Sequence, residues 1–125
     1  MTGVQTCALP IYTQLVARLQ QQIVSGVYPP GSKLPSVREL AADAGANPNT
    51  VQRAFAELER AGLIYTQRTA GKFVTEDAAA VAAARRSLAE AQTRQYLAAM
   101  RALGCGKQEI HNLFDQMEEQ EHADL

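Results

Sequence analysis

The sequence of 125 residues lacks several features, and each absence excludes a class of protein. No apolar run approaches the ~20 residues of a transmembrane helix, and the amino terminus has neither the basic start nor the long apolar stretch of a secretory signal. Two cysteines, Cys7 and Cys105, cannot form a disulfide scaffold or a four-ligand zinc site. With 46% hydrophobic and 20% charged residues the composition is globular, so we expect a cytoplasmic protein without membrane contact.

Catalytic motifs are also lacking. We find no Ser/His/Asp or Cys/His set, no phosphate-binding loop and no carboxylate pair in an apolar setting. His111 and His122 are eleven residues apart with acidic neighbours, and solvated surface is favoured over a metal site there. Cys105 lies between glycines, which favours a small residue in a chain break over a redox-sensitive thiol. We therefore predict that the protein is not an enzyme and needs no metal or cofactor.

Charge is distributed unevenly along the chain. Residues 12–75 hold seven Lys or Arg and four Asp or Glu, whereas residues 76–125 hold five and nine. The net charge of −1 alone argues against nucleic-acid binding, but the basic front and acidic back indicate two modules with different partners.

Residues 1–11 have no charged side chain and no periodicity. Back-translated with a GTG start, they match a widely used sequencing adapter codon for codon. We expect them to be a non-native leader, and we do not interpret Cys7 as a functional thiol.

Residues 12–75 predict three helices and a hairpin. The first helix covers residues 12–23 and ends at Ser25–Gly26. The second starts with a capping box, Ser36 to Glu39, and ends at Gly45. Asn47 as N-cap and Pro48 as first residue start the third, whose predicted buried stripe is Val51, Ala54, Phe55, Leu58 and Ala61.

Two β-prone segments, 63–67 and 72–75, flank a predicted hairpin turn at 68–71. Three helices followed by a small hairpin are typical of a winged helix-turn-helix. The predicted fold is therefore mainly α, with a winged helix-turn-helix at 12–75 and a two-helix module at 76–125.

Residues 77–103 can form one helix of ~40 Å, followed by a break at 104–106 and a last helix. The apolar stripes of both helices are narrow, so we expect a second copy of the protein to cover them. The predicted dimerisation residues are Leu88, Tyr96, Met100, Leu103, Ile110, Leu113, Phe114 and Met117. Polar and alanine-rich sequence here leaves little room for a ligand site of ~300 Å³.

A helix-turn-helix places the amino end of its second helix in the major groove of DNA. In this chain that end is residues 47–53. The amides of Asn49 and Gln52 can bond base edges, and Thr50 can reach a phosphate oxygen or a thymine methyl. Arg53 and Arg38 suit phosphate neutralisation.

Each of these residues also has a purely structural interpretation. Asn47 is first a helix cap, with a phosphate contact as a second role. Arg53 can be a solvated surface charge. Arg68 and Lys72 flank a turn that can lie along the minor groove or the backbone, or they keep the hairpin soluble.

The motifs taken in order resemble the GntR family of bacterial transcription regulators. They are Pro10-Ile-Tyr12, Pro29-Pro-Gly-Ser-Lys-Leu-Pro-Ser-Val-Arg-Glu-Leu40, Asn47-Pro-Asn-Thr-Val51, Glu57-Leu-Glu-Arg-Ala-Gly-Leu63 and Gly71-Lys-Phe-Val74. The short helical remainder is similar to the YtrA-type subfamily. The resemblance implies DNA contacts from Arg38, Asn47, Asn49, Thr50 and Gln52, and wing contacts near Arg68 and Gly71. Pro48 stands where other branches have a guanine-reading Arg.

Two function hypotheses follow. The first is a dimeric, sequence-specific transcription regulator, a repressor that binds a palindromic operator and excludes polymerase until an effector, of unknown identity, releases it. The second is a winged-helix adaptor that binds proteins and not DNA.

Overall fold

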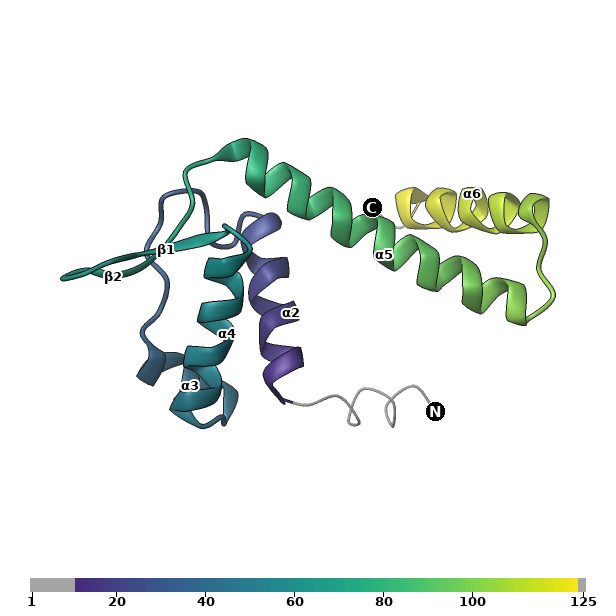
Figure 1. Ribbon diagram of the computed structural model, residues 1–125. Coiled ribbons are helices and arrows are strands. Elements are labelled where there is room, and N and C mark those ends of the chain that lie inside the picture. Colours follow the sequence, from purple (N-terminus) through teal and green to yellow (C-terminus); the bar gives the residue numbers. More distant parts are fainter. Residues whose placement is uncertain (1–10, 124–125) are drawn as a thin grey trace. The chain divides into compact units, whose positions relative to one another are not determined.

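The computed structural model describes residues 11–123. Within them lie the helices α2 (Ile11–Val24), α3 (Val37–Ala44) and α4 (Pro48–Arg60), the strands β1 (Ile64–Gln67) and β2 (Gly71–Val74), and the helices α5 (Ala78–Ala102) and α6 (Lys107–Ala123) (Figure 1). The first ten residues of the predicted leader lie outside the described residues. Its last residue, Ile11, is exposed and begins α2.

Helices α2, α3 and α4 form a bundle whose core is aliphatic with one aromatic ring. α4 packs against α2, α3 and β1. Its apolar side chains at i, i+3, i+4 and i+7 lie on one face, so the polar residues between them point outward. The buried residues are Leu15, Leu19, Ile23, Leu34, Leu40, Ala41, Val51, Ala54, Phe55, Leu58, Leu63, Ile64 and Val74.

The prediction for Ala61 is wrong: this residue is exposed and not part of the buried stripe. α4 ends at Arg60, and Ala61 is its C-cap. Gly62 follows at φ +80°, a conformation that other residues rarely adopt. Because the chain turns at Gly62, directly after Ala61, no further helical turn follows that would cover this side chain.

β1 and β2 are antiparallel, with Ile64 opposite Val74 and Gln67 opposite Gly71. The loop before α3 adds to the other edge of β2. Leu34 N–H donates to the Lys72 carbonyl at 2.9 Å, Val74 N–H donates to the Ser32 carbonyl at 2.9 Å, and Lys33 forms a bridge with Phe73. The hairpin is thus paired on both sides of β2, and the fold is a winged helix-turn-helix followed by a helical C-terminal region.

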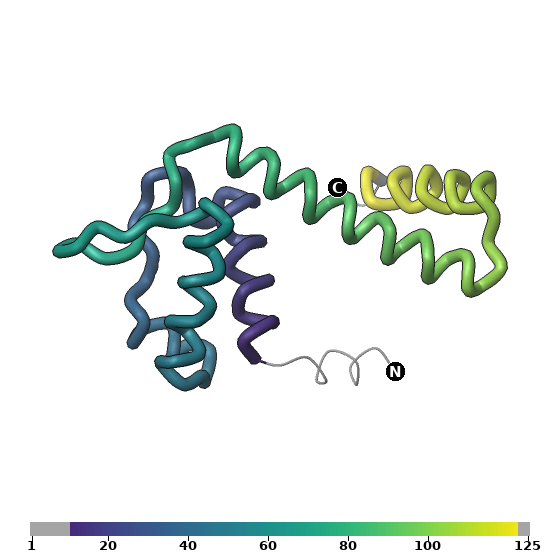
Figure 2. Tube along the Cα trace, viewed as in Figure 1, coloured from purple at the N-terminus to yellow at the C-terminus, as the bar shows by residue number. Residues whose placement is uncertain are grey.

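The chain divides into two compact units after Arg86, inside α5, whereas the sequence predicts a domain boundary at residue 76. Figure 2 traces the chain through both units. The break predicted at 104–106 lies between α5 and α6. No residue of α5 is fully buried, and no helix within 11–123 is long and apolar enough to cross a membrane.

Candidate nucleic-acid interface

The amino end of α4 is fixed by its cap. Asn47 has an extended backbone, and its side-chain oxygen accepts a hydrogen bond from the Asn49 amide N–H at 2.8 Å. Pro48 occupies the first helical turn, where its missing N–H costs no hydrogen bond. The predicted cap is confirmed. It uses the side-chain oxygen of Asn47, so the NH₂ group of the same side chain is left to face a ligand.

Three polar side chains follow the cap on the outer side of α4. Asn49 and Gln52 are exposed and Thr50 is half-buried. Within the described residues, neither the Asn49 nor the Gln52 side-chain amide group has a hydrogen-bond partner. The buried Val51 and Phe55 anchor the opposite side of the helix. Both amides are therefore held on a rigid element and free to bond a ligand.

α3 begins at the predicted capping box. Ser36 Oγ accepts from the Glu39 N–H at 3.1 Å, and the Glu39 carboxylate accepts from the Ser36 N–H at 3.0 Å. The Ser36 backbone N–H, and after it the Ser36 side chain, lower the pKa of the Glu39 carboxyl by hydrogen bonding to it. Gly45 ends the helix at φ +63°. Arg38 lies exposed in the first turn, so its guanidinium is available to a phosphate beside α4.

Arg53 is oriented by the first helix. Its guanidinium carbon lies 4.4 Å from the centre of the Tyr12 ring, a cation–π arrangement. The Tyr12 hydroxyl donates to a Glu57 carboxylate oxygen at 3.4 Å, and Glu57 pairs with Arg60. Tyr12 therefore holds Arg53 against α2. The sequence does not predict this role, because only the packing of α2 on α4 brings the two residues together.

The wing carries two basic residues, one in its turn and one in β2. Arg68 lies exposed in the turn at its tip, and Gly71 follows at φ +109°. The rings of Tyr65 and Phe73 stack with centres 5.8 Å apart and stiffen the hairpin. Lys72 differs from Arg68, since its ammonium lies 3.0 Å from a Glu59 oxygen and forms a partly exposed ion pair with it.

Lys33 is a further basic residue that the sequence analysis left unassigned. It is exposed and is held beside the wing by its bridge with Phe73. A β-carbon added at Gly71 would lie 3.4 Å from Lys33 Cε, so the end of the Lys33 side chain lies beside the start of β2. No local pattern in the sequence predicts that Lys33 lies beside the wing, because its pairing with Phe73 joins residues far apart in the chain.

The C-terminal unit has a different character. α5 and α6 flank a half-open hollow of about 990 Å³, lined among others by Tyr96, Leu97, Ile110 and Phe114. The expectation that these helices leave little room for a pocket is therefore wrong.

Leu103, Phe114 and Met117 are more than half exposed. Among the predicted dimerisation residues, Leu88, Met100, Ile110 and Leu113 are half-buried and Tyr96 is exposed.

The candidate metal ligands among residues 11–123 are dispersed. Within residues 11–123, no three His, Cys, Asp or Glu side chains lie close enough to hold a metal ion. His122 lies 3.9 Å from a Glu118 oxygen on the exposed side of α6. The thiol of Cys105 has its pKa raised by desolvation and then by the nearby Glu109 carboxylate, which favours the protonated form over the reactive thiolate.

Comparison with known proteins agrees with this geometry. The family model "Bacterial regulatory proteins, gntR family" matches residues 11–74. The HTH-type transcriptional repressor YtrA of Bacillus subtilis is 49% identical over 69 residues, which are 55% of this chain and 53% of YtrA. The chain therefore aligns with about half the length of that relative.

Solved structures extend the likeness. A GntR family transcriptional regulator from Listeria monocytogenes superposes with a TM-score of 0.81 at 40% identity, covering 87% of this chain and 96% of that one. The DNA-binding domain of AraR in complex with operator ORR3 superposes with a TM-score of 0.52 at 31% identity, covering 54% of this chain and 81% of that one. The chain belongs to the GntR family and is a transcription regulator with a winged helix-turn-helix DNA-binding domain.

Proposed function

We propose that the protein is a homodimeric repressor that binds a palindromic operator in double-stranded DNA. The observation that carries this proposal is the pair of unpartnered amides, Asn49 and Gln52, exposed at the capped amino end of α4. Amides at this end of a recognition helix bond adenine bidentately or other base edges singly. The AraR DNA-binding domain, which shares this fold, is solved in complex with an operator, and this supports DNA binding by the winged domain here.

The remaining residues of the interface have supporting roles. Thr50 contacts a phosphate or a thymine methyl, and Asn47 adds a phosphate contact through the NH₂ group that its cap leaves free. Arg38 and Arg53 neutralise phosphates and so set the position of α4 without reading sequence. At the wing, Arg68 and Gly71 follow the minor groove or the backbone. Lys72, which the sequence places beside them, is paired with Glu59.

The C-terminal helices supply the dimer interface in this proposal. α5 and α6 expose Leu103, Phe114 and Met117, and no side chain of α5 is fully buried. A second copy would cover these residues and the hollow beside them. Because a two-fold dimer presents two α4 helices, its half-sites lie ~34 Å apart or at a multiple of that distance.

Repression is then steric: an occupied operator that overlaps a promoter excludes polymerase. The alternative is a winged-helix adaptor that binds protein and not DNA. The salt dependence of binding separates the two, because each phosphate neutralised steepens the fall of log affinity with log salt by about 0.9. An adaptor shows no DNA affinity at any salt concentration.

Two variants test the division of roles. Asn49→Ala should relax base preference at one or two operator positions, with a loss of about 1–3 kcal/mol on the preferred sequence only. Arg38→Ala should weaken binding to all sequences alike and reduce the salt slope by about 1. Fluorescence anisotropy against an operator and its single-base variants measures both. Equal losses from both variants on every sequence would contradict the proposed roles.

A further inference from the structure

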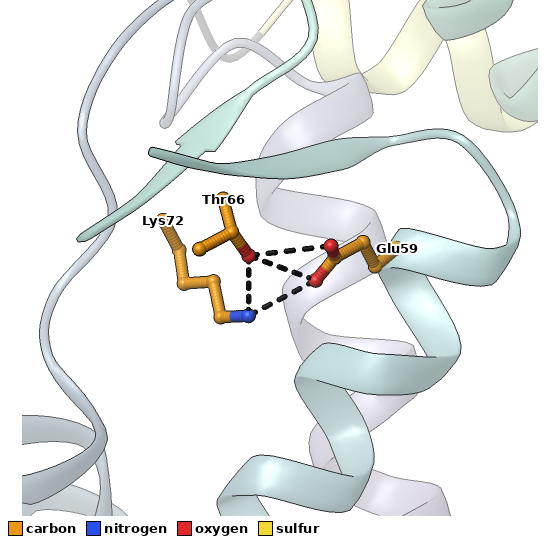
Figure 3. Close-up of polar contacts among 3 residues, drawn as sticks. All are labelled: Glu59, Thr66 and Lys72. Atoms are coloured by element: carbon orange, nitrogen blue, oxygen red, sulfur yellow. Dashed lines mark hydrogen bonds and ion pairs between the residues drawn. The ribbon is translucent and has the colours of Figure 1, made fainter. Parts of the chain in front are cut away.

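Three side chains meet where the wing leaves the recognition helix. Glu59 comes from the last turn of α4, Thr66 from β1 and Lys72 from β2 (Figure 3). The Thr66 hydroxyl donates to the two Glu59 carboxylate oxygens at 3.1 and 3.2 Å. The Lys72 ammonium donates to Glu59 Oε1 at 3.0 Å and to Thr66 Oγ1 at 2.6 Å. The three groups form a closed ring of hydrogen bonds.

The ring matches what each group can donate and accept. Thr66 has one hydroxyl proton, which goes to Glu59, and a lone pair that accepts from Lys72. Lys72 uses two of its three protons on the ring. Hydrogen bonding by Lys72 is the largest influence on the pKa of Glu59 and lowers it; burial opposes this, and the Thr66 hydrogen bond lowers the pKa further. Glu59 is therefore ionised at neutral pH, and the lysine charge has its counter-charge within the protein.

The ring also joins α4 to both strands of the wing. Residues 61–63 are the only ones between α4 and β1, and the buried Ile64 and Val74 anchor the base of the hairpin in the core. The ring adds a polar connection between the last turn of α4 and the more exposed part of the hairpin. Arg68, at the tip of the wing, has no ion-pair partner within the described residues, so the tip remains free to meet DNA.

We propose that Glu59, Thr66 and Lys72 form a wing latch, which sets the angle of the wing on α4 and holds Lys72 away from the DNA backbone. Lys72 is then a positioning residue and not a phosphate contact. This inference rests on the proposed DNA binding by α4 and the wing. A latched wing meets DNA at one fixed angle to α4. Because its charge is paired, Lys72 adds nothing to sequence-independent affinity.

The test compares salt slopes on a scrambled duplex for the full-length wild type, Lys72→Ala, Glu59→Ala and the double variant. The latch predicts that Lys72→Ala leaves the slope unchanged. Glu59→Ala frees the ammonium for a phosphate, so the slope steepens by about 0.9 and binding at 0.15 M salt tightens about fivefold. Adding Lys72→Ala to Glu59→Ala should restore the wild-type slope. Glu76→Ala, which removes the same charge beyond β2, is the matched control and should leave the slope unchanged.

Positioning has its own readout, the ratio of operator to scrambled affinity. Glu59→Ala and Thr66→Val should both lower this ratio, although Thr66→Val changes no charge and keeps a β-branched strand residue. Pairs between exposed groups contribute little to folding stability, so we expect every variant to fold, and melting curves check this. Two results would overturn the latch. One is a salt slope that falls by about 0.9 in the single variant Lys72→Ala. The other is a Glu59→Ala variant with the same salt slope and the same affinity ratio as a wild type that binds DNA. Wild-type protein that binds no DNA would contradict the proposed function itself.

Discussion

Truncation of Phe114 should separate the dimer without unfolding the winged domain. Phe114 lies on α6 and is 58% exposed, so its ring stabilises the single chain only in part. An aromatic side chain presents ~200 Å², and ~115 Å² of it is then available to a second copy. At ~25 cal/mol per Å², complete coverage contributes about 3 kcal/mol for each ring.

A two-fold dimer buries this ring twice. Alanine keeps the β-carbon, so Phe114→Ala should lose about 2 kcal/mol for each copy and about 4 kcal/mol for the dimer. The dissociation constant should rise about 10³-fold. Sedimentation equilibrium across a range of protein concentrations measures it.

Asn112→Ala is the matched control, because Asn112 is exposed on the polar side of α6 and its loss changes no charge. It should leave the dissociation constant within a factor of about two to three, as expected for an exposed site. An unchanged dissociation constant for Phe114→Ala, or a wild type that is monomeric at all concentrations, would refute the assignment of α6 to the interface.

Three further outcomes follow from the winged domain. Leu58→Ala, at a fully buried position of α4, should destabilise the domain by about 2–5 kcal/mol in chemical denaturation, whereas Leu103→Ala, at a 77% exposed position, should change monomer stability by less than about 0.5 kcal/mol. Ser36→Ala removes the capping box of α3 and should cost about 1 kcal/mol, a fall in melting temperature of about 4–8 °C. Because hydrogen bonds lower the pKa of Glu39 in the folded state, its contribution is present above its ordinary pKa and lost as the pH falls through the lowered value. The melting-temperature difference between wild type and Glu39→Ala should therefore be full at pH 6 and shrink below about pH 4, and a pH-independent difference would contradict the cap.

Local signals in the sequence predicted the helix boundaries of the winged domain. The capping box at Ser36, the Asn47–Pro48 start and the Gly45 stop all depend on residues within three or four positions of each other. Their hydrogen bonds form wherever the helix forms, so tertiary structure did not change them. The core stripe of α4 was predictable for the same reason, except at Ala61, where the helix ends one residue before it.

Contacts between distant segments were not predictable. Lys33 pairs with Phe73 only because the loop before α3 runs along β2, and Tyr12 meets Arg53 only because α2 packs on α4. The sequence places Lys72 beside a turn, and nothing local indicates that Glu59 lies within reach of its ammonium. A one-dimensional pattern gives the face on which a side chain lies but not its partner from another element.

The most direct test of DNA recognition by α4 is selection from a random duplex pool, followed by an anisotropy titration of the enriched sequence and a scrambled control at one salt concentration. We expect a palindrome with half-sites about one helical turn apart or a multiple of that, bound at least about 10³-fold more tightly than the control. Folded, dimeric protein that enriches no sequence would contradict the proposal that Asn49 and Gln52 read bases.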